Sequence, residues 1–273
     1  MRFFDSKSDP EIGYVQAPTS EGLVIESHGA RIFGLCLAPA LYSSEERRPV
    51  VVMCHGMPGV DPNADLAQAL RRAGFFVIYF RYRGMWGSQG TCSFTHVIED
   101  VRAVVEYVRS GKINMPIDFE RIYLLGHSVG GFAVLNALAN GLKVKRAVLM
   151  APCNLSYRYR FNYDSVLKSI KASYEKGYYH LPHADALMED LAKNAASWDF
   201  ATLASRLPRE TQYHFICGMQ DGVCPAEKHV GPLLDDMEKR GMQFTYCEWD
   251  DGHAFHATRV HLSDVIVDLL KEE

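Results

Sequence analysis

The sequence predicts a doubly wound α/β fold, in which a mostly parallel sheet carries helices on both of its faces. The first observation is an alternation: short β-branched or aromatic runs are followed by longer segments with helical periodicity along most of the 273 residues. The second is that these runs are almost continuously apolar, which is typical of strands covered on both faces. The third is composition, because 48% apolar and 23% charged residues match an average globular domain and exclude a disordered or fibrous chain.

The N-terminal part of the chain predicts an antiparallel hairpin at one edge of the sheet. Two runs, Gly22–Ile25 and Arg31–Leu37, flank the turn-forming pair His28-Gly29. Further strands are expected at Val50–Cys54, Phe75–Arg81, Arg121–Gly126, Arg146–Ala151, Tyr213–Cys217 and Phe244–Trp249. Helices are expected between them, at Asp65–Ala73, Thr95–Arg109, Val129–Asn140, Glu227–Arg240 and Thr258–Lys271.

One interval interrupts this alternation. About 60 residues separate the strand that ends at Ala151 from the strand that begins at Tyr213, far more than a crossover between parallel strands needs. The interval is rich in tyrosine and has helical patterns at Asp164–Lys176 and Ala184–Lys193. Insertions of this length in compact domains tend to be functional lids. We therefore expect a core formed by residues 1–151 and 208–273, with residues 152–207 inserted as a cap.

The charge balance argues against two classes of partner. The chain has 33 acidic and 29 basic residues, a net charge of −4. Nucleic-acid binding needs a basic face, and attachment to anionic membranes needs a polybasic segment, so neither partner is expected. No apolar run approaches the roughly 18 residues that span a bilayer. The first ten residues carry Asp5, Lys7 and Asp9 where a signal peptide would be apolar, so we expect a cytoplasmic protein.

The cysteine and histidine spacings predict neither a disulfide framework nor a metal site. Seven cysteines are scattered along the chain without a Cys-x-x-Cys pair. His180 and His183 have a spacing that metal ligands use, but the pattern supplies no third ligand. We expect no metal and no cofactor.

The strongest chemical signal is Gly126-His127-Ser128-Val129-Gly130, which fits G-x-S-x-G. It stands between a predicted strand and a predicted helix, which is the context that this motif requires. The turn is so tight that only small residues fit beside the serine, and it lifts the serine hydroxyl into solvent at the carboxyl end of the sheet. Ser128 is therefore the candidate nucleophile.

A serine hydroxyl needs a general base, and the base needs a third group to orient it. With this motif, the chain order is serine, then acid, then histidine. Asp221 follows the predicted strand Tyr213–Cys217, and His253 follows Phe244–Trp249, so both lie at carboxyl ends of strands. Rival residues lie nearby, namely Asp250 and Asp251 for the acid and His256 for the base. We favour Asp221 and His253.

Acyl transfer also needs two N–H donors for the developing oxyanion. Val129 follows the serine at a helix N-terminus and is expected to supply one of them. The second is expected from the glycine- and proline-rich turn after the strand Val50–Cys54. Met57 is the candidate donor there, because Pro58 has no N–H. His55 in the same turn is interpreted as a structural residue that braces the loop.

Five segments together resemble the α/β-hydrolase superfamily: Val50–Gly59, Tyr82–Gly90, Gly126–Gly131, Gly218–Pro225 and Gly252–Phe255. Within it, the Tyr-Arg-Gly-Met-Trp-Gly-Ser-Gln-Gly run is similar to single-domain esterases and peptidases related to the prolyl-oligopeptidase catalytic domain. The resemblance covers about residues 20–271 apart from the cap. This sequence differs from many lipases of the superfamily in its oxyanion loop, which reads His-Gly-Met-Pro-Gly where those lipases have His-Gly-Gly-Gly.

The resemblance implies the α/β-hydrolase fold, with Ser128 as nucleophile, Asp221 as acid and His253 as base. It also implies Met57 and Val129 as the oxyanion donors.

Three more residues are candidates for substrate binding. Trp86 is expected to line the acyl pocket, and Tyr159 and Arg160 in the cap could contact the acyl group or recognise a carboxylate. The alternative for Tyr159 and Arg160 is packing within the cap, with the arginine stem covering apolar surface.

The expected function is that of a serine hydrolase, which cleaves carboxylic esters through an acyl-enzyme. Two alternatives stay open: an aminopeptidase or amidase that acts on short peptides, and a non-catalytic ligand-binding homologue. The expected partner is therefore a small ester or a short peptide. The sequence does not fix the oligomeric state.

Overall fold

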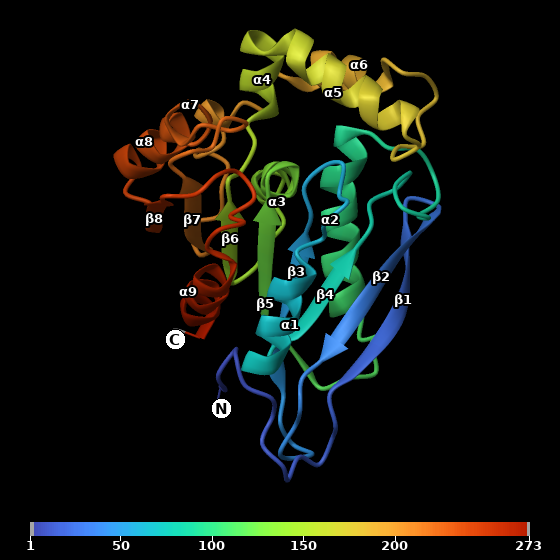
Figure 1. The fold of residues 1–273 in the computed structure, drawn as a ribbon, viewed down its shortest axis with the longest axis vertical. Coiled ribbons are helices and arrows are strands. Elements are labelled where there is room, and N and C mark those ends of the chain that lie inside the picture. The colour runs from blue at the N-terminus through green and yellow to red at the C-terminus, as the bar shows by residue number, and fades with distance from the viewer. Residues whose placement is uncertain (1–2, 272–273) are drawn as a thin grey trace.

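The computed structural model describes residues 3–271, and the strands in this range form one eight-stranded sheet (Figure 1). The strands are β1 (Thr19–Ser27), β2 (Ala30–Ala38), β3 (Arg48–Cys54), β4 (Phe76–Phe80), β5 (Ile117–His127), β6 (Arg146–Met150), β7 (Gln212–Gly218) and β8 (Phe244–Trp249). Their order across the sheet is β1-β2-β4-β3-β5-β6-β7-β8. The pairings of β1 with β2 and of β2 with β4 are antiparallel, and the others are parallel. The predicted fold class is confirmed.

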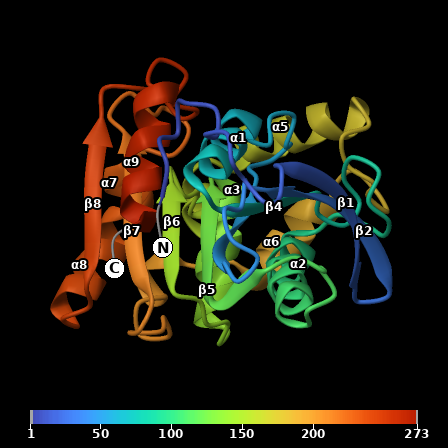
Figure 2. The same ribbon diagram turned by 90° about the horizontal axis from the view of Figure 1, so that it is seen from below.

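Helices cover both faces of this sheet (Figure 2). They are α1 (Ala64–Ala73), α2 (Phe94–Arg109), α3 (Val129–Ala139), α4 (Leu155–Phe161), α5 (Tyr163–Glu175), α6 (Ala186–Asn194), the short 3₁₀ helix η1 (Phe200–Thr202), α7 (Ala226–His229), α8 (Gly231–Lys239) and α9 (Arg259–Lys271). The buried residues of α1 and α9 belong to one hydrophobic core, and those of α2, α3 and α8 belong to a second core. The sheet therefore separates two cores.

Strand β3 shows why its sequence is continuously apolar. Val50, Val52 and Cys54 point into the core under α2 and α3, whereas Val51 and Met53 point into the core under α1 and α9. All five are buried. A polar residue at any of them would lose its contact with water, so alternation of polar and apolar residues is absent from this strand.

The predicted N-terminal hairpin is present as β1 and β2. His28 and Gly29 form its two-residue turn with φ values of 48° and 79°. Positive φ at both central positions is the geometry that matches the twist of a two-stranded ribbon. The turn leaves β1 at the edge of the sheet.

The predicted helix Glu227–Arg240 is wrong as a single element. The chain instead forms α7 and α8, with Val230 between them. Pro232 lies in the first turn of α8, where its missing N–H costs nothing, but it cannot continue a preceding helix. Helix α4 was not predicted from the Tyr-Arg run that forms it.

The segment 152–207 lies at the end of the molecule to which the parallel strands point, with α4, α5 and α6 above the sheet (Figure 1). It is fastened to the core by hydrogen bonds. His180 donates its backbone N–H to the Gly84 oxygen at 2.7 Å and accepts the Cys92 N–H at 2.9 Å. The Asp190 carboxylate of α6 accepts the backbone N–H and the hydroxyl of Thr95 at the start of α2.

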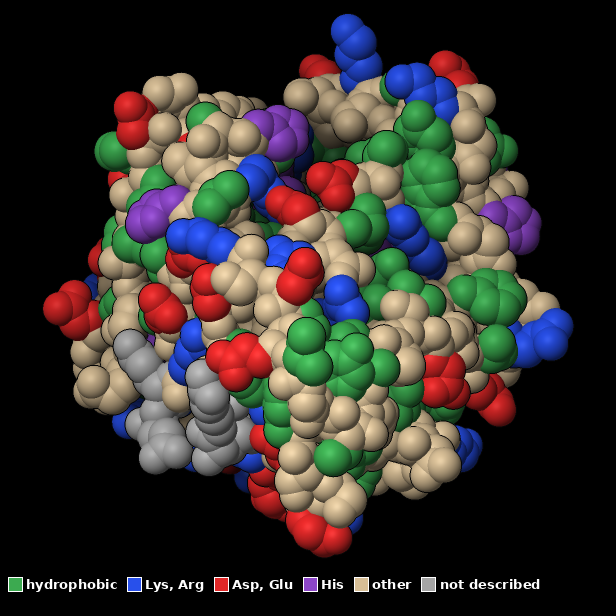
Figure 3. All heavy atoms as spheres, turned by 60° about the horizontal axis from the view of Figure 1, so that its bottom comes forward, with side chains coloured by type: hydrophobic (Ala, Val, Ile, Leu, Met, Phe, Trp, Pro, Cys, Tyr) green, Lys and Arg blue, Asp and Glu red, His purple; other side chains and the backbone are tan. Residues whose placement is uncertain are grey.

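Acidic and basic side chains are interspersed on the face of the molecule that Figure 3 shows. No helix among the described residues is both long and apolar enough to cross a membrane.

Candidate active site

Ser128 lies on a sharp turn between β5 and α3, with φ 55° and ψ −118°. The neighbouring glycines make this turn sterically feasible. A Cβ at Gly130 would overlap the carbonyl oxygen of Cys54, and one at Gly126 would lie 2.7 Å from the Gly130 oxygen. The backbones of β5, α3 and β3 thus lie so close together that no side chain fits between them. This close approach is the physical basis of the G-x-S-x-G pattern.

His253 bridges Ser128 and Asp221 in the structure. Its Nε2 lies 2.9 Å from the Ser128 Oγ, and its Nδ1 lies 2.7 Å from an Asp221 carboxylate oxygen. With Nδ1–H donated to the carboxylate, Nε2 presents a lone pair to the serine hydroxyl. The sequence placed these residues at the ends of β5, β7 and β8, and the parallel sheet brings their side chains together.

The Asp221 carboxylate is held from both sides. The oxygen that does not face His253 accepts the backbone N–H groups of Val223 and Cys224, each at 2.8 Å. Burial by itself would raise the pKa of Asp221, but the hydrogen bonds from His253 and from these two N–H groups outweigh it, so its pKa lies below the usual value. Asp221 is therefore ionised at neutral pH.

The rival acids have other partners. The Asp250 carboxylate accepts the Gln220 side-chain amide at 2.6 Å. The Asp251 carboxylate accepts the N–H groups of Gly252 and Ala257 and the Thr258 hydroxyl, so it shapes the loop that carries His253.

The rival base, His256, is exposed.

His127, the variable residue of the serine motif, makes a contact that the sequence does not predict. Its Nε2 lies 2.9 Å from the backbone oxygen of His253, and the two rings are 5.2 Å apart. Burial and the nearby His253 lower the pKa of His127 to about 4, so its ring is neutral near pH 7 and donates Nε2–H to that oxygen. No sequence pattern marks this contact, because it joins residues that are far apart in the chain.

The turn after β3 lies directly against the serine. A Cβ added at Gly56 would lie 3.1 Å from the Ser128 Cβ, which places the turn that contains Met57 beside Ser128. Val129 is the first residue of α3, where backbone N–H groups have no acceptor within the helix.

His55 braces this turn. Its Nδ1 lies 2.6 Å from the Gly56 oxygen, and its ring packs on Tyr82 with centroids 4.4 Å apart. Burial lowers the pKa of His55 to about 3, so it stays neutral.

Trp86 connects this turn with the segment 152–207. Its indole N–H donates to the Pro58 oxygen at 2.7 Å, and its ring stacks on Tyr178 with centroids 5.1 Å apart. The Arg81 guanidinium lies 5.6 Å from the indole centroid.

The other two candidate binding residues make contacts within their own segment. Arg160 forms an ion pair with Asp199 and donates to the Ser156 hydroxyl at 2.8 Å. The Tyr159 ring meets Tyr163 edge-on at 5.6 Å. These contacts match the alternative of packing within the segment, and pocket lining by Tyr159 and Arg160 stays a prediction.

The fold and the hydroxyl–imidazole–carboxylate arrangement at the carboxyl ends of its strands are those of an α/β hydrolase. The family model described as alpha/beta hydrolase fold matches residues 49–213, which is more than half of the chain. The chain therefore belongs to this family.

Curated relatives match over part of their length. An uncharacterized 31.7 kDa protein from the traX-finO intergenic region of Escherichia coli is 32% identical over 118 residues, which are 41% of this chain and 40% of the relative. An uncharacterized protein of Mycobacterium tuberculosis is 33% identical over 130 residues, 47% of this chain and 43% of the relative. The chain thus matches about two fifths of the length of these relatives.

Solved structures are similar over nearly the whole chain. An acylaminoacyl peptidase of Pyrococcus horikoshii has a TM-score of 0.70 at 14% identity, covering 94% of this chain and 42% of that chain. A puromycin-hydrolyzing peptidase of Mycobacterium tuberculosis has a TM-score of 0.69 at 19% identity, covering 96% and 40%. At these identities the similarity shows the fold.

Proposed function

We propose that the protein is a serine hydrolase in which Ser128 is the nucleophile, His253 the general base and Asp221 the residue that orients the base. One observation carries this proposal. The Ser128 hydroxyl, the His253 imidazole and the Asp221 carboxylate form a continuous chain of contacts at 2.9 and 2.7 Å. A pure ligand-binding homologue would not need these three groups in line, which makes the non-catalytic alternative the weaker one.

In the proposed reaction, the Ser128 Oγ attacks a substrate carbonyl while His253 Nε2 takes the hydroxyl proton. The ionised Asp221 stabilises the imidazolium that forms. The N–H groups of Met57 and Val129 would stabilise the oxyanion of the tetrahedral intermediate. His253 then gives its proton to the leaving group, and water hydrolyses the acyl-enzyme by the same steps.

We propose carboxylic esters as the first substrate class. An alkoxide leaving group needs less assistance from the enzyme than an amine leaving group does, which favours esters. Short peptides are the second candidate, because the acylaminoacyl peptidase and the puromycin-hydrolyzing peptidase share the fold. We further propose that residues 152–207 act as a cap over the site, since α4–α6 lie beyond the strand ends that carry these residues.

Labelling with a fluorophosphonate tests the nucleophile. We expect wild-type protein to be labelled and Ser128→Ala to be unlabelled, because only a base-activated serine reacts with this probe. Ser205→Ala is a matched control, since Ser205 is exposed and its hydroxyl contacts the Thr202 oxygen at 3.3 Å. Labelling that persists at another serine in Ser128→Ala would contradict the proposal.

The substrate class is tested separately. A series of p-nitrophenyl esters of increasing chain length is compared with aminoacyl-p-nitroanilides. Faster turnover of the esters supports the ester proposal, and faster turnover of the anilides supports the peptidase alternative. Labelling of Ser128 without turnover of either series would point to another acyl group.

A further inference from the structure

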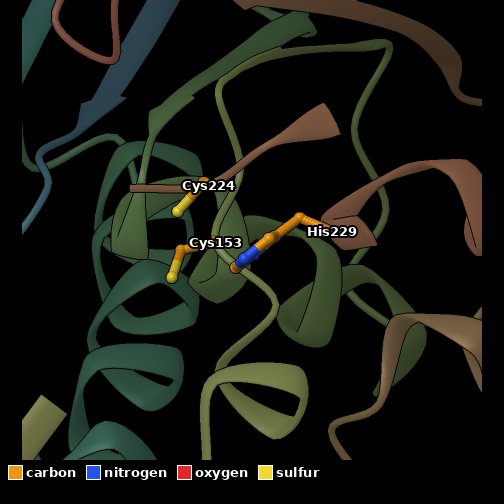
Figure 4. A group of neighbouring side chains, drawn as sticks. All are labelled: Cys153, Cys224 and His229. Carbon is orange, nitrogen blue, oxygen red and sulfur yellow. The ribbon is translucent and has the colours of Figure 1, made fainter. Parts of the chain in front are cut away.

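Cys153, Cys224 and His229 form a buried cluster (Figure 4). The two sulfur atoms and a ring nitrogen of His229 all lie within 4.8 Å of one another. The three residues come from different parts of the chain: Cys153 follows β6, Cys224 follows β7, and His229 ends α7. Each side chain is buried, with about 1% of its surface exposed.

The hydrogen bonding of His229 argues against a metal ion at this cluster. Its Nδ1 lies 3.0 Å from the backbone nitrogen of Asn154. A backbone N–H can only donate, so Nδ1 accepts, and the neutral ring carries its proton on Nε2. The single lone pair of the imidazole is therefore already used, and no nitrogen is available for a metal.

The two thiols have different acidities. The hydrogen bond from Cys224 lowers the pKa of Cys153 despite burial, and the neighbouring His229 lowers this pKa further. Burial raises the pKa of Cys224, and the charge of Cys153 raises it further. Cys153 is therefore the more acidic thiol of the pair, which assigns it the role of nucleophile and Cys224 the role of resolving partner.

Each cysteine is bonded through its backbone to one residue of the proposed active site. The Cys153 N–H donates to the Ser128 carbonyl oxygen at 3.0 Å. The Cys224 N–H donates to the Asp221 carboxylate at 2.8 Å. A movement of the Cys153 sulfur therefore acts on Ser128, the proposed nucleophile, through one hydrogen bond. A movement of the Cys224 sulfur acts on Asp221, the proposed acid, in the same way.

We propose that Cys153 and Cys224 are an oxidative modification site, at which a peroxide forms a reversible disulfide that lowers the activity of Ser128. The effect on activity rests on the proposed function, whereas the formation of the disulfide does not. A disulfide requires about 2.05 Å between the sulfur atoms, so the two loops must approach each other. This approach pulls the Cys224 N–H away from Asp221 and alters the support of His253.

The reaction balances with hydrogen peroxide as the oxidant. The Cys153 thiolate attacks one peroxide oxygen, which breaks the O–O bond and gives a sulfenic acid and hydroxide. The Cys224 thiol then attacks the Cys153 sulfur, forms the S–S bond and expels the hydroxyl. Its proton and the one first released by Cys153 complete two water molecules. Two thiols are oxidised by two electrons, and one peroxide is reduced.

The burial of the cluster selects small oxidants. Gly222 and Val223 form an exposed turn next to Cys224, so a small movement of this turn admits a molecule of the size of peroxide. A bulky disulfide such as oxidised glutathione cannot reach the sulfurs by the same movement. We therefore expect oxidation by hydrogen peroxide and not by oxidised glutathione.

The test uses the full chain treated with hydrogen peroxide, followed by mapping of disulfide-linked peptides by mass spectrometry and by fluorophosphonate labelling. We expect a Cys153–Cys224 cross-link that dithiothreitol reverses. Labelling of Ser128 should fall about tenfold and recover on reduction. Cys153→Ser and Cys224→Ala should each lose the peroxide effect. Cys247→Ser is the matched control, because Cys247 is a half-buried thiol on β8, outside the cluster, and should keep the effect.

Three outcomes would overturn the inference. The first is that both thiols stay free after peroxide treatment of the wild-type protein. This measurement does not depend on the folding of any variant. The second is a cross-link that forms without any change in labelling. The third is stoichiometric binding of zinc chloride that is lost in Cys153→Ser, which would identify a metal site. If Ser128 is not labelled in either the reduced or the oxidised protein, the proposed function fails. The peptide map still shows whether the Cys153–Cys224 disulfide forms.

Discussion

Ser128 holds a φ of 55° and a ψ of −118°, a conformation that costs a residue with a side chain about 1–3 kcal/mol. Such strain persists only where the surroundings enforce it. Here the close packing of β3, β5 and α3 enforces it, and Gly130 makes that packing feasible.

We expect Gly130→Ala to lower the free energy of unfolding by about 3 kcal/mol, because its Cβ would overlap the Cys54 carbonyl. Fluorophosphonate labelling should be lost with it. Gly22→Ala is the control, because no atom lies within 4 Å of the added methyl, and its effect should stay within about 0.5 kcal/mol. Urea unfolding measures both. A Gly130→Ala variant as stable as wild type would contradict the close approach of Gly130 to the Cys54 carbonyl oxygen.

The contacts of the two aspartates predict different losses of activity. Asp221→Asn should reduce kcat by roughly 10⁴-fold, because the amide cannot hold His253 in the tautomer that accepts the serine proton. Asp250→Asn should cost less than about tenfold, since Asp250 contacts Gln220 and not His253. Steady-state kinetics on the ester that is turned over fastest gives both values. The reverse ranking would show that the acid is misassigned.

At the scale of the residue, the sequence could predict the candidate catalytic residues at the strand ends but not the residues that pack against them. Ser128, Asp221 and His253 each follow an apolar run, so a local pattern locates them. His127 contacts His253 across the sheet, and nothing in the neighbouring residues of either one encodes that contact. Tertiary contacts of this kind depend on strand order, which periodicity does not give.

At the scale of the element, the loop between β4 and α2 connects the turn after β3 with the segment 152–207. Trp86 makes both connections, one through its indole N–H to Pro58 and the other through its ring to Tyr178. Two substitutions, each of which removes one of these contacts and keeps the other, test them separately.

Trp86→Phe removes the hydrogen bond and keeps an aromatic face for Tyr178. We expect kcat to fall several-fold for all esters alike, because the turn that carries Met57 is less firmly held. Tyr178→Leu keeps the hydrogen bond and removes the stacking, so we expect unequal changes of KM along the ester series. Equal changes of KM in both variants would contradict the proposal that residues 152–207 cover the site.

The predicted strands and the hairpin are found because buried strands and a two-residue turn have strong local patterns. Helix α4 was missed because its alternating tyrosines and arginines have no 3.6-residue apolar period. The break between α7 and α8 was missed although Gly231-Pro232 marks it, because the apolar spacing runs on across it.

At the scale of the whole molecule, three histidines couple stability to pH: His55 and His214 are buried, and His127 is partly buried. Burial lowers the pKa of His55 to about 3 and the pKa values of His127 and His214 to about 4. In the unfolded chain each takes up a proton below about pH 6.5. The neutral rings thus stabilise the fold fully above that pH, and this stability is lost as pH falls toward 4.

We expect the free energy of unfolding to fall by up to about 4 kcal/mol per pH unit below pH 6, the slope for three protons. His214→Gln should remove about a third of this slope. Thr245→Val removes the hydroxyl that contacts His214 Nδ1 but keeps the ring, and should retain the slope. Urea unfolding between pH 5 and 7 measures it. An unchanged slope in His214→Gln would mean that its ring is protonated in the folded protein.

Strand β8 is the last strand in the sheet order, is paired only with β7 among the described residues, and carries several exposed residues. The loop after it presents His253, whereas Ser128 follows the central strand β5. Local opening at a sheet edge requires less free energy than global unfolding. Mild urea should therefore inactivate the protein before far-ultraviolet circular dichroism reports loss of the helices. Amide hydrogens of β8 should exchange with deuterium faster than those of β5 under the same conditions.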